Sequence, residues 1–457
     1  MQDLTTIDRR TRWVVAVAIA SGASLIAAVA VPVGAATPGG NRVALVLPLS
    51  LVAGLGLTVL AFARFELFVL VLIALRSSLD TLKISSSSVD ATGAVSVLFI
   101  GATLVWLIRH EGAFDTPSPA RRLVPPFSML LSAAAVSVVF SSRPLESSLE
   151  VVRIGTVVVI VVALARLIRT GSDIRRFLLA LIASAAIPLL VAGLEIARGG
   201  AGITPLGIGR VDGTFQHPNP FAAYLFLMLI LGVALFPHVV SRWKWVLAAL
   251  IASSGGALVA TYARGAWIAT VVGLTVVALL QSRRLLWWIG AVVIVLALAV
   301  PSVGVRLSDL SESRSPSGAA ANSLAWRIGY WEETLARQNN PLLGIGLKEV
   351  QSDERLAAAP HNDFVRLYVE TGLVGLAAYL WLLGALFREA VATFRRSTPG
   401  LSRGLAVAFL ATLSGIVVLS TAANVISQLV ILWYFATIVT LALAASRAVP
   451  DPPPRQA

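Results

Sequence analysis

The sequence predicts an all-α polytopic membrane protein with about 12 to 14 transmembrane helices and one long outer-face loop containing a short amphipathic helix. Its 457 residues are 57% hydrophobic and only 13% charged, with a mean hydropathy of +0.85. A soluble protein carries about 25% charged residues, so soluble enzymes, nucleic-acid-binding modules and disordered scaffolds are disfavoured. The net charge of +13 is no nucleic-acid signal, because cytoplasmic loops of membrane proteins collect Lys and Arg.

About fourteen apolar stretches recur along the chain, most of them near the roughly 20 residues that a helix needs to cross a bilayer. They lie at residues 14 to 35, 43 to 62, 65 to 75, 91 to 108, 125 to 141, 149 to 165, 177 to 197, 220 to 237, 245 to 262, 265 to 281, 285 to 304, 364 to 387, 404 to 421 and 424 to 446. The stretch at 65 to 75 is short for a span and is a candidate re-entrant segment. The region 245 to 281 can be divided in more than one way.

Basic residues indicate the orientation of these stretches. Arg9, Arg10 and Arg12 precede the first stretch and no cleavage-site pattern follows it, so we expect an uncleaved anchor and a cytoplasmic N-terminus. Every second connection is then basic, which predicts that both termini are cytoplasmic. The basic residues of these connections and of the tail are Arg64, Arg109, Arg121, Arg122, Arg166, Arg169, Arg175, Arg176, Arg242, Lys244, Arg283, Arg284, Arg388, Arg395, Arg396, Arg403, Arg447 and Arg455.

This orientation divides the chain into four parts. An N-terminal transmembrane bundle is expected over residues 1 to 304, with an outer loop at 198 to 219. A long outer loop follows at 305 to 363, then C-terminal transmembrane helices at 364 to 446 and a cytoplasmic tail at 447 to 457. The two outer loops hold most of the residues that could take part in catalysis or ligand binding.

The long outer loop opens with a Ser-rich run at 307 to 322, which is typical of flexible loop. Beyond it, four apolar residues recur on one helical face, and Asn322 or Ser323 is available as the N-cap. The four are Leu324, Ile328, Trp331 and Leu335. Their spacing predicts a short amphipathic helix along the outer membrane surface.

Arg210, His217 and Asn219 are candidates in the first outer loop. Asn219 can cap, and Pro220 can begin, the helix that follows. The free N–H groups and positive dipole end of that helix would lie beside Arg210, where they suit a phosphate. In the alternative interpretation, Arg210 reaches lipid headgroups and His217 is an ordinary loop residue.

Two further arginines are expected near the outer surface. Arg264 lies between two apolar stretches with hardly any loop, so it either ends the helices at the headgroup layer or points into a polar cavity. Arg327 lies one helical turn before Trp331, and it is either a surface residue of the amphipathic helix or a ligand for an anion beneath it. Spacing does not separate these alternatives.

His361 is the residue that we single out first. It precedes Asn362, which can cap the helix that enters the membrane, so its imidazole would stand at a helix entrance on the outer face. Taken alone, such a histidine is more often structural or solvated. Farther along the helix, Gly372 and Gly375 lie on one face and would let another helix approach closely.

The spacing of these four residues resembles the signature of the O-antigen ligase and polymerase superfamily, the WaaL-like ligases and Wzy-type polymerases. In that signature, His-Asn is followed, after nine residues, by Gly-x-x-Gly, and the match here has no departure. Three more segments resemble the family in the family's order, and the resemblance covers roughly residues 200 to 390. These segments are residues 210 to 219, residues 261 to 267, and the run from Arg327 through Trp331 to Gly346.

The resemblance implies transfer of a glycan from an undecaprenyl-diphosphate donor to an acceptor hydroxyl on the outer face of the cytoplasmic (inner) membrane. It implies that His361 is the catalytic base, since an imidazole with a pKa of about 6.5 is a neutral base at neutral pH. Arg210, Arg264 and Arg327 would hold the diphosphate, with His217, Asn219, Trp331, Asn362, Gly372 and Gly375 in support. No cofactor or metal is expected, because arginines would supply the positive charge and the outer segments contain no Asp-x-Asp or His-Glu-x-x-His pattern.

Several functions remain open at this point. Ligases, Wzy-type polymerases and protein O-oligosaccharyltransferases share this chemistry, so the acceptor is a lipid, a second glycan or a protein. A transporter or flippase of a lipid-linked anionic substrate is the alternative of another class. Transporters place substrate groups near the bilayer midplane and often have two related halves, whereas the candidates here gather at one face and no repeat is visible. Membrane lipids are further expected partners, and nucleic acid is not.

Overall fold

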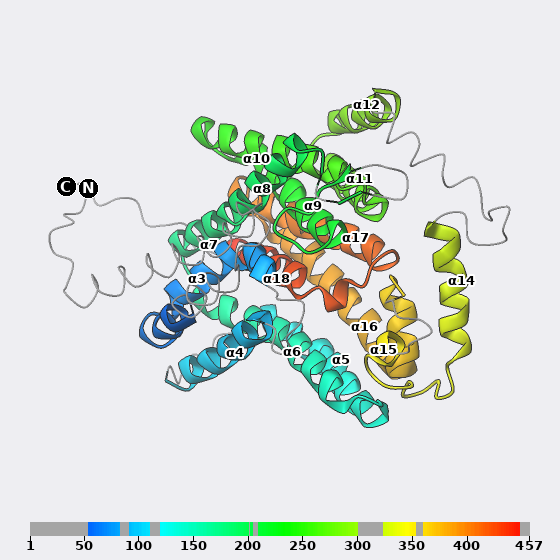
Figure 1. Ribbon diagram of the computed structural model, residues 1–457. Helices are drawn as coiled ribbons and strands as arrows, with labels where there is room; N and C mark the ends of the chain where they lie inside the picture. The colour runs from blue at the N-terminus through cyan, green and yellow to red at the C-terminus, as the bar shows by residue number, and fades with distance from the viewer. Residues whose placement is uncertain are drawn as a thin grey trace, which may run out of the picture.

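The computed structural model describes residues 54 to 82, 91 to 109, 119 to 200, 202 to 203, 209 to 299, 323 to 352 and 360 to 447. These residues are almost entirely helical, which confirms the predicted fold class (Figure 1). One two-residue antiparallel pair, Gly202–Ile203 (β1) with Gly209–Arg210 (β2), lies within the first outer loop.

The helices have the following bounds. They are α3 (Phe65–Leu75), α4 (Ala91–Arg109), α5 (Val124–Ser137), α6 (Pro144–Leu167), α7 (Gly171–Ala183), α8 (Ala186–Ala197), α9 (Pro218–Leu235), α10 (Ser241–Ala260), α11 (Arg264–Gln281), α12 (Arg284–Ala299), α14 (Ser323–Ala336), α15 (Glu349–Ser352), α16 (Asp363–Arg396), α17 (Leu401–Ser420) and α18 (Leu429–Ala445). A further apolar helix, Gly54–Ala63, precedes α3.

The described helices make this chain a multi-pass membrane protein. Seven segments are long and apolar enough to cross a membrane: Pro144–Leu167, Gly171–Ala197, Pro218–His238, Ser241–Ala260, Arg264–Gln281, Asp363–Arg396 and Leu401–Ser420. Five shorter apolar helices lie at Gly54–Ala63, Val95–Arg109, Val124–Phe140, Arg284–Val295 and Leu429–Ala445. The predicted stretch at 14 to 35, the first part of that at 43 to 62, the Ser-rich run and most of the tail lie outside the described residues.

Helix α9 is the centre of the bundle. Of its 18 residues, 14 are buried, and α10, α11, α17 and α18 pack around it. Its apolar residues therefore cover the whole circumference, as expected of a helix with no solvent-facing or lipid-facing side. Because α9 begins at Pro218, this rigid element places the first outer loop.

The predicted span at 177 to 197 is two helices, α7 and α8, separated by a turn. Pro188 has no N–H to bond the carbonyl of Ser184, and that carbonyl instead accepts a hydrogen bond from the Ser77 hydroxyl at 2.8 Å. The carbonyl of Ser77 in turn accepts one from the Thr214 hydroxyl at 2.7 Å. This buried chain of polar contacts ties the first outer loop to the interior of the bundle.

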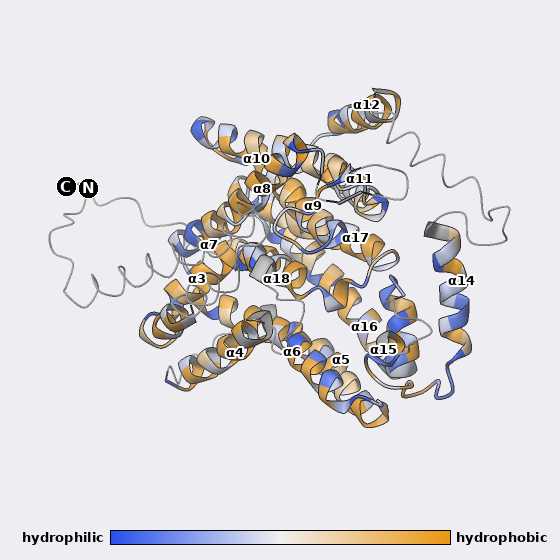
Figure 2. Cartoon of the chain, viewed as in Figure 1, coloured by the Kyte–Doolittle hydropathy of each residue, from blue (hydrophilic) through white to orange (hydrophobic). Residues whose placement is uncertain are grey.

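Peripheral helices present apolar side chains outward. On α12, Trp287 and Leu298 are 83% and 80% exposed. Figure 2 shows that orange, hydrophobic residues predominate on most of the apolar helices. Such exposure is costly in water and favourable in hydrocarbon. The surface is therefore that of a protein surrounded by lipid.

The helix directions separate two ends of the bundle. α9 and α16 begin at one end, beside His217 and His361, and the charge of His217 lowers the pKa of His361. α16 finishes at Arg396 at the other end, where Arg122 pairs with Glu389 at 3.2 Å. We call these the histidine end and the basic end. Arg396 and Arg447, from two of the connections assigned to the cytoplasm, lie beside Glu389 at the basic end.

Cysteine substitution in this cysteine-free chain tests the orientation. Asn339, beyond α14, and Ser282, between α11 and α12, are both exposed, at the histidine end and the basic end respectively. We expect a membrane-impermeant maleimide to label Asn339→Cys in intact cells, and to label Ser282→Cys only after the membrane is opened. The reverse pattern would place the histidine end in the cytoplasm.

Candidate active site

Arg210 links two helix ends at the histidine end. Its Nε donates a hydrogen bond to the carbonyl of Thr261 at 2.8 Å, and its Nη2 donates one to Oδ1 of Asn219 at 3.1 Å. Thr261 follows α10 and Asn219 lies in the first turn of α9. The half-buried guanidinium is thereby held at a fixed angle between two membrane helices.

The predicted N-cap of α9 is wrong. The helix begins at Pro218, and the cap is His217, whose Nδ1 accepts a hydrogen bond from the backbone N–H of Asn219 at 3.1 Å. The side chain of Asn219 is engaged with Arg210 instead. Burial and the charge of Arg210 lower the pKa of His217, so the ring is neutral and able to accept the capping bond.

Arg264 is placed by a tight turn between α10 and α11. Tyr262 adopts a left-handed conformation, with φ of 52°, and the indole N–H of Trp267 donates to the carbonyl of Leu258 at 2.9 Å. A non-glycine residue in this region carries local strain. The turn presents Arg264 as the first residue of α11, at the histidine end.

Helix α14 confirms the predicted amphipathic helix and lies beside α16 (Figure 1). The predicted apolar face is divided, because Ile328 and Leu335 are 46% and 41% exposed. Trp331 is turned toward the protein, and its indole N–H donates to the carbonyl of Pro360 at 2.6 Å. This bond connects α14 to the residue that precedes His361.

His361 stands at the entrance to α16, as predicted. Its backbone is left-handed, with φ of 51°. Asn362 caps the helix by accepting from the N–H groups of Phe364 and Val365 at 3.0 and 3.2 Å, which confirms the predicted cap. The N–H of Asn362 donates to Oδ1 of Asn424 at 3.1 Å, so the loop after α17 also holds this segment.

The candidate residues converge electrostatically. Burial, followed by the charges of Arg327 and His217, lowers the pKa of His361 to about 4. The pKa of Arg327 is lowered by burial and by the charge of Arg264. The pKa of His217 responds in turn to the charge of Arg210. These pairwise electrostatic effects connect three arginines and two histidines from four separate segments.

A buried ion cluster that the sequence did not reveal lies in the first two turns of α16, after His361. The guanidinium of Arg366 contacts Glu370 at 2.9 Å, Glu150 of α6 at 3.4 Å and the hydroxyl of Ser427. Lys348 approaches Glu150 at 3.8 Å. The sequence signal that could have revealed this cluster is the presence of charged residues within apolar helices. Such residues need partners, because burying an unpaired charge is costly.

The predicted glycine face on α16 is also wrong. Gly372 has φ of 68° and breaks the helix, and a methyl group there would overlap the backbone of Leu342. The freed N–H of Leu373 donates to the carbonyl of Pro341 at 2.8 Å. The space beside Gly375 is filled by the side chain of Thr371 from its own helix. The two glycines accommodate a docked loop and a folded-back side chain, and no second helix.

The described residues contain no group of three or more His, Asp or Glu side chains that could hold a metal ion. Arg366 and Lys348 are paired with buried carboxylates, and Arg210, Arg264 and Arg327 add further positive charge at the histidine end. Guanidinium groups can make two-point contacts with phosphate oxygens. The arrangement is suited to holding a diphosphate beside a neutral imidazole.

These features define a multi-pass membrane protein with arginine and histidine side chains gathered at one end of a helical bundle. Residues 248–380 match the family model described as O-Antigen ligase, so this part of the chain is an O-antigen ligase domain. The match contains Arg264, Arg327 and His361 and begins after Arg210 and His217. No curated protein matches the chain.

Alanine at Gly372 should destabilise the protein. The left-handed conformation costs a non-glycine residue about 1 to 3 kcal/mol, and the added methyl group also meets the Leu342 backbone. Gly384 on the same helix is the matched control, since a methyl group there meets nothing within 4 Å. We expect a lower melting temperature for Gly372→Ala and not for Gly384→Ala. Equal melting temperatures for Gly372→Ala and the wild type would contradict the role assigned to the break.

Proposed function

We propose that this protein is a metal-independent glycosyltransferase of the O-antigen ligase type. It moves a glycan from an undecaprenyl-diphosphate donor to an acceptor hydroxyl at the outer face of the cytoplasmic membrane. The observation that supports this proposal most is the grouping of Arg210, Arg264 and Arg327 with a neutral His361. Three cations and one base are the groups that a leaving diphosphate and an incoming hydroxyl require.

In the proposed reaction, the acceptor oxygen attacks the anomeric carbon of the donor glycan. The bond between that carbon and the phosphate oxygen breaks, and undecaprenyl diphosphate leaves as an anion held by the arginines. His361 takes the proton of the acceptor hydroxyl and later releases it to water. A single displacement of this kind inverts the anomeric configuration. The reaction needs no metal, because the guanidinium groups neutralise the developing charge.

In this scheme, the lowered pKa of His361 keeps its imidazole neutral and therefore able to accept a proton. An imidazole beside three arginines in an exposed site could still protonate in mild acid, whereas burial and Arg327 keep this one neutral. Binding of the anionic donor would offset the charge of Arg327 and raise the pKa of His361. The base would therefore become stronger once the donor is in place.

Replacement of His361 should separate chemistry from binding. His361→Ala removes the proposed base, so we expect turnover to fall by about 100 to 10,000-fold while donor affinity is largely kept. Ala at Arg210, Arg264 or Arg327 should weaken donor binding as well as turnover, and Lys should restore either only in part. Single-turnover rates and donor affinities of the variants distinguish a role in the chemical step from a role in donor binding.

Arg337 is the matched control for Arg327. It directly follows α14, which carries Arg327, and it pairs with Glu333 at 3.4 Å. Arg337→Ala should therefore leave turnover and donor affinity near those of the wild type. Near-normal turnover in His361→Ala would reduce that residue to a structural role at the helix entrance. Full activity in all three arginine variants would favour the transporter interpretation.

The pH dependence should report the depressed pKa of His361. A base must be neutral, so activity is lost as pH falls through the pKa of the free enzyme. We expect the acidic limb of kcat/KM to have its midpoint at about 4, below the value of about 6.5 for an exposed histidine. Arg327→Gln should move this midpoint upward because it removes a nearby positive charge, and Arg337→Gln should not. An acidic limb that is the same in both variants would exclude His361 as the titrating base.

A further inference from the structure

Glu195 is an acidic residue near the end of α8, within the span Gly171–Ala197. Its neighbours on that helix, from Gly193 to Ala197, are otherwise apolar or glycine. An ionisable side chain is costly in such a helix unless partners hold it. Its partners include the backbone of the loop that carries Arg210.

The carboxyl group of Glu195 accepts two backbone hydrogen bonds from the first outer loop. Its Oε2 atom accepts from the N–H of Asp212 at 3.1 Å and from the N–H of Gly213 at 2.8 Å. Arg210 lies two residues before Asp212 in the chain. Partly buried N–H groups need an acceptor, so Glu195 ties the backbone that follows Arg210 to α8.

The side chain of Asp212 adds a further link between Glu195 and Arg210. The carboxyl groups of Asp212 and Glu195 are hydrogen-bonded to each other. Since an ionised carboxylate only accepts, one of the two groups must carry a proton. Burial raises the pKa of Asp212, and the nearby charge of Arg210 opposes this rise. Asp212 therefore interacts with Glu195 through a hydrogen bond and with Arg210 through charge.

The same stretch of loop is packed closely against three helices. Gly213 has φ of 58°, and a methyl group there would meet the ring of Phe221 in α9 and the carbonyl of Pro188 in α8. The N–H of Val211 donates to the carbonyl of Ala260 at the end of α10, at 3.2 Å. The bonds to Glu195 thus belong to a loop whose backbone position is determined by α8, α9 and α10.

We propose that Glu195 is a positioning residue that directs Arg210 toward the diphosphate of the donor. The proposal rests on the proposed glycosyltransferase function. Arg210 also bonds the carbonyl of Thr261 and the side chain of Asn219, so a shift of the backbone at Asp212 would change the angle of its guanidinium. Two-point contact with phosphate depends on that angle. Without Glu195, Arg210 would remain present but would hold the donor less tightly.

Three replacements of Glu195 in the purified full-length protein test the proposal. Glu195→Gln keeps an oxygen that accepts both N–H groups and an amide that can donate to Asp212, so we expect donor affinity near that of the wild type. Glu195→Asp shortens the side chain by one methylene group, and Glu195→Ala removes it. Both should weaken binding of a labelled undecaprenyl-diphosphate glycan by about tenfold, because a hydrogen bond from Arg210 to phosphate is lost.

A double variant tests whether the effect passes through Arg210. Arg210→Ala removes the contact that Glu195 is proposed to position. Glu195→Ala should therefore add little to the loss of donor affinity that Arg210→Ala already causes. Two residues that act independently would instead give losses that multiply.

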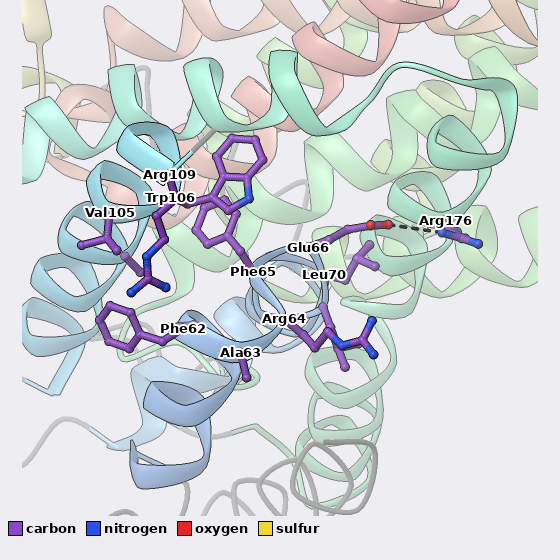
Figure 3. A pocket seen from close by; sticks show the side chains of 13 residues that line it. Phe62, Ala63, Arg64, Phe65, Glu66, Leu70, Val105, Trp106, Arg109 and Arg176 are labelled. Carbon is purple, nitrogen blue, oxygen red and sulfur yellow. Dashed lines mark hydrogen bonds and ion pairs between the residues drawn. The ribbon is translucent and has the colours of Figure 1, made fainter. Parts of the chain in front are cut away.

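A carboxylate at the other end of the same span provides the control. Arg176 lies near the start of Gly171–Ala197, and it pairs with Glu66 of α3 at 3.3 Å (Figure 3). Glu66→Ala removes an acidic side chain that also joins this span to another element. It should leave donor affinity unchanged, because Glu66 does not contact the loop that carries Arg210.

Three results would overturn the proposal. They are wild-type donor affinity in Glu195→Asp and Glu195→Ala, an equal loss of affinity in Glu195→Gln and Glu195→Ala, and losses that multiply in the double variant. If Glu195→Ala fails to fold, Glu195→Asp replaces it in each comparison. A wild-type protein that binds the donor but transfers no glycan would contradict the proposed function, and the affinities would still decide the role of Glu195.

Discussion

The pairing of a buried arginine with two buried carboxylates is the constraint on which the rest of the histidine end depends. Arg366 lies between Glu370 and Glu150, and all three side chains are almost fully inaccessible. Removing one partner of a buried pair strands the other charge, at a cost of about 3 to 5 kcal/mol. The cluster therefore fixes α6 against the first two turns of α16, and His361 lies immediately before those turns.

The other parts of the site are attached to the same short segment of α16. The loop after α17 reaches it through Asn424 and Ser427, and the indole of Trp331 reaches the residue before His361. The break at Gly372 releases backbone groups that bind residues 341 to 346, as in the bond from Ile345 N–H to the carbonyl of Val369 at 2.9 Å. Segments far apart in the chain thus share one anchor, which accounts for the position of α14, and with it Arg327, beside His361.

Sequence reasoning succeeded where the cause is local. Apolar runs predicted the membrane helices, Asn362 was correctly predicted to cap α16, and the spacing around Trp331 predicted α14. It failed where a long-range contact determines the conformation or the hydrogen-bond partner of a residue. The side chain of Asn219 is taken by Arg210, and Gly372 is non-helical because a loop some 30 residues earlier docks on it. The partners of Arg366 are up to 216 residues away, so helical periodicity could not reveal them.

The central claim is that the cluster around His361 transfers a glycan and releases a polyprenyl diphosphate. The most direct measurement mixes the purified protein in nanodiscs with a labelled undecaprenyl-diphosphate glycan and a set of lipid, glycan and protein acceptors. The account predicts a labelled acceptor with inverted anomeric configuration, together with an equal amount of unlabelled undecaprenyl diphosphate. An intact donor with every acceptor, combined with movement of that donor between leaflets in vesicles, would contradict it.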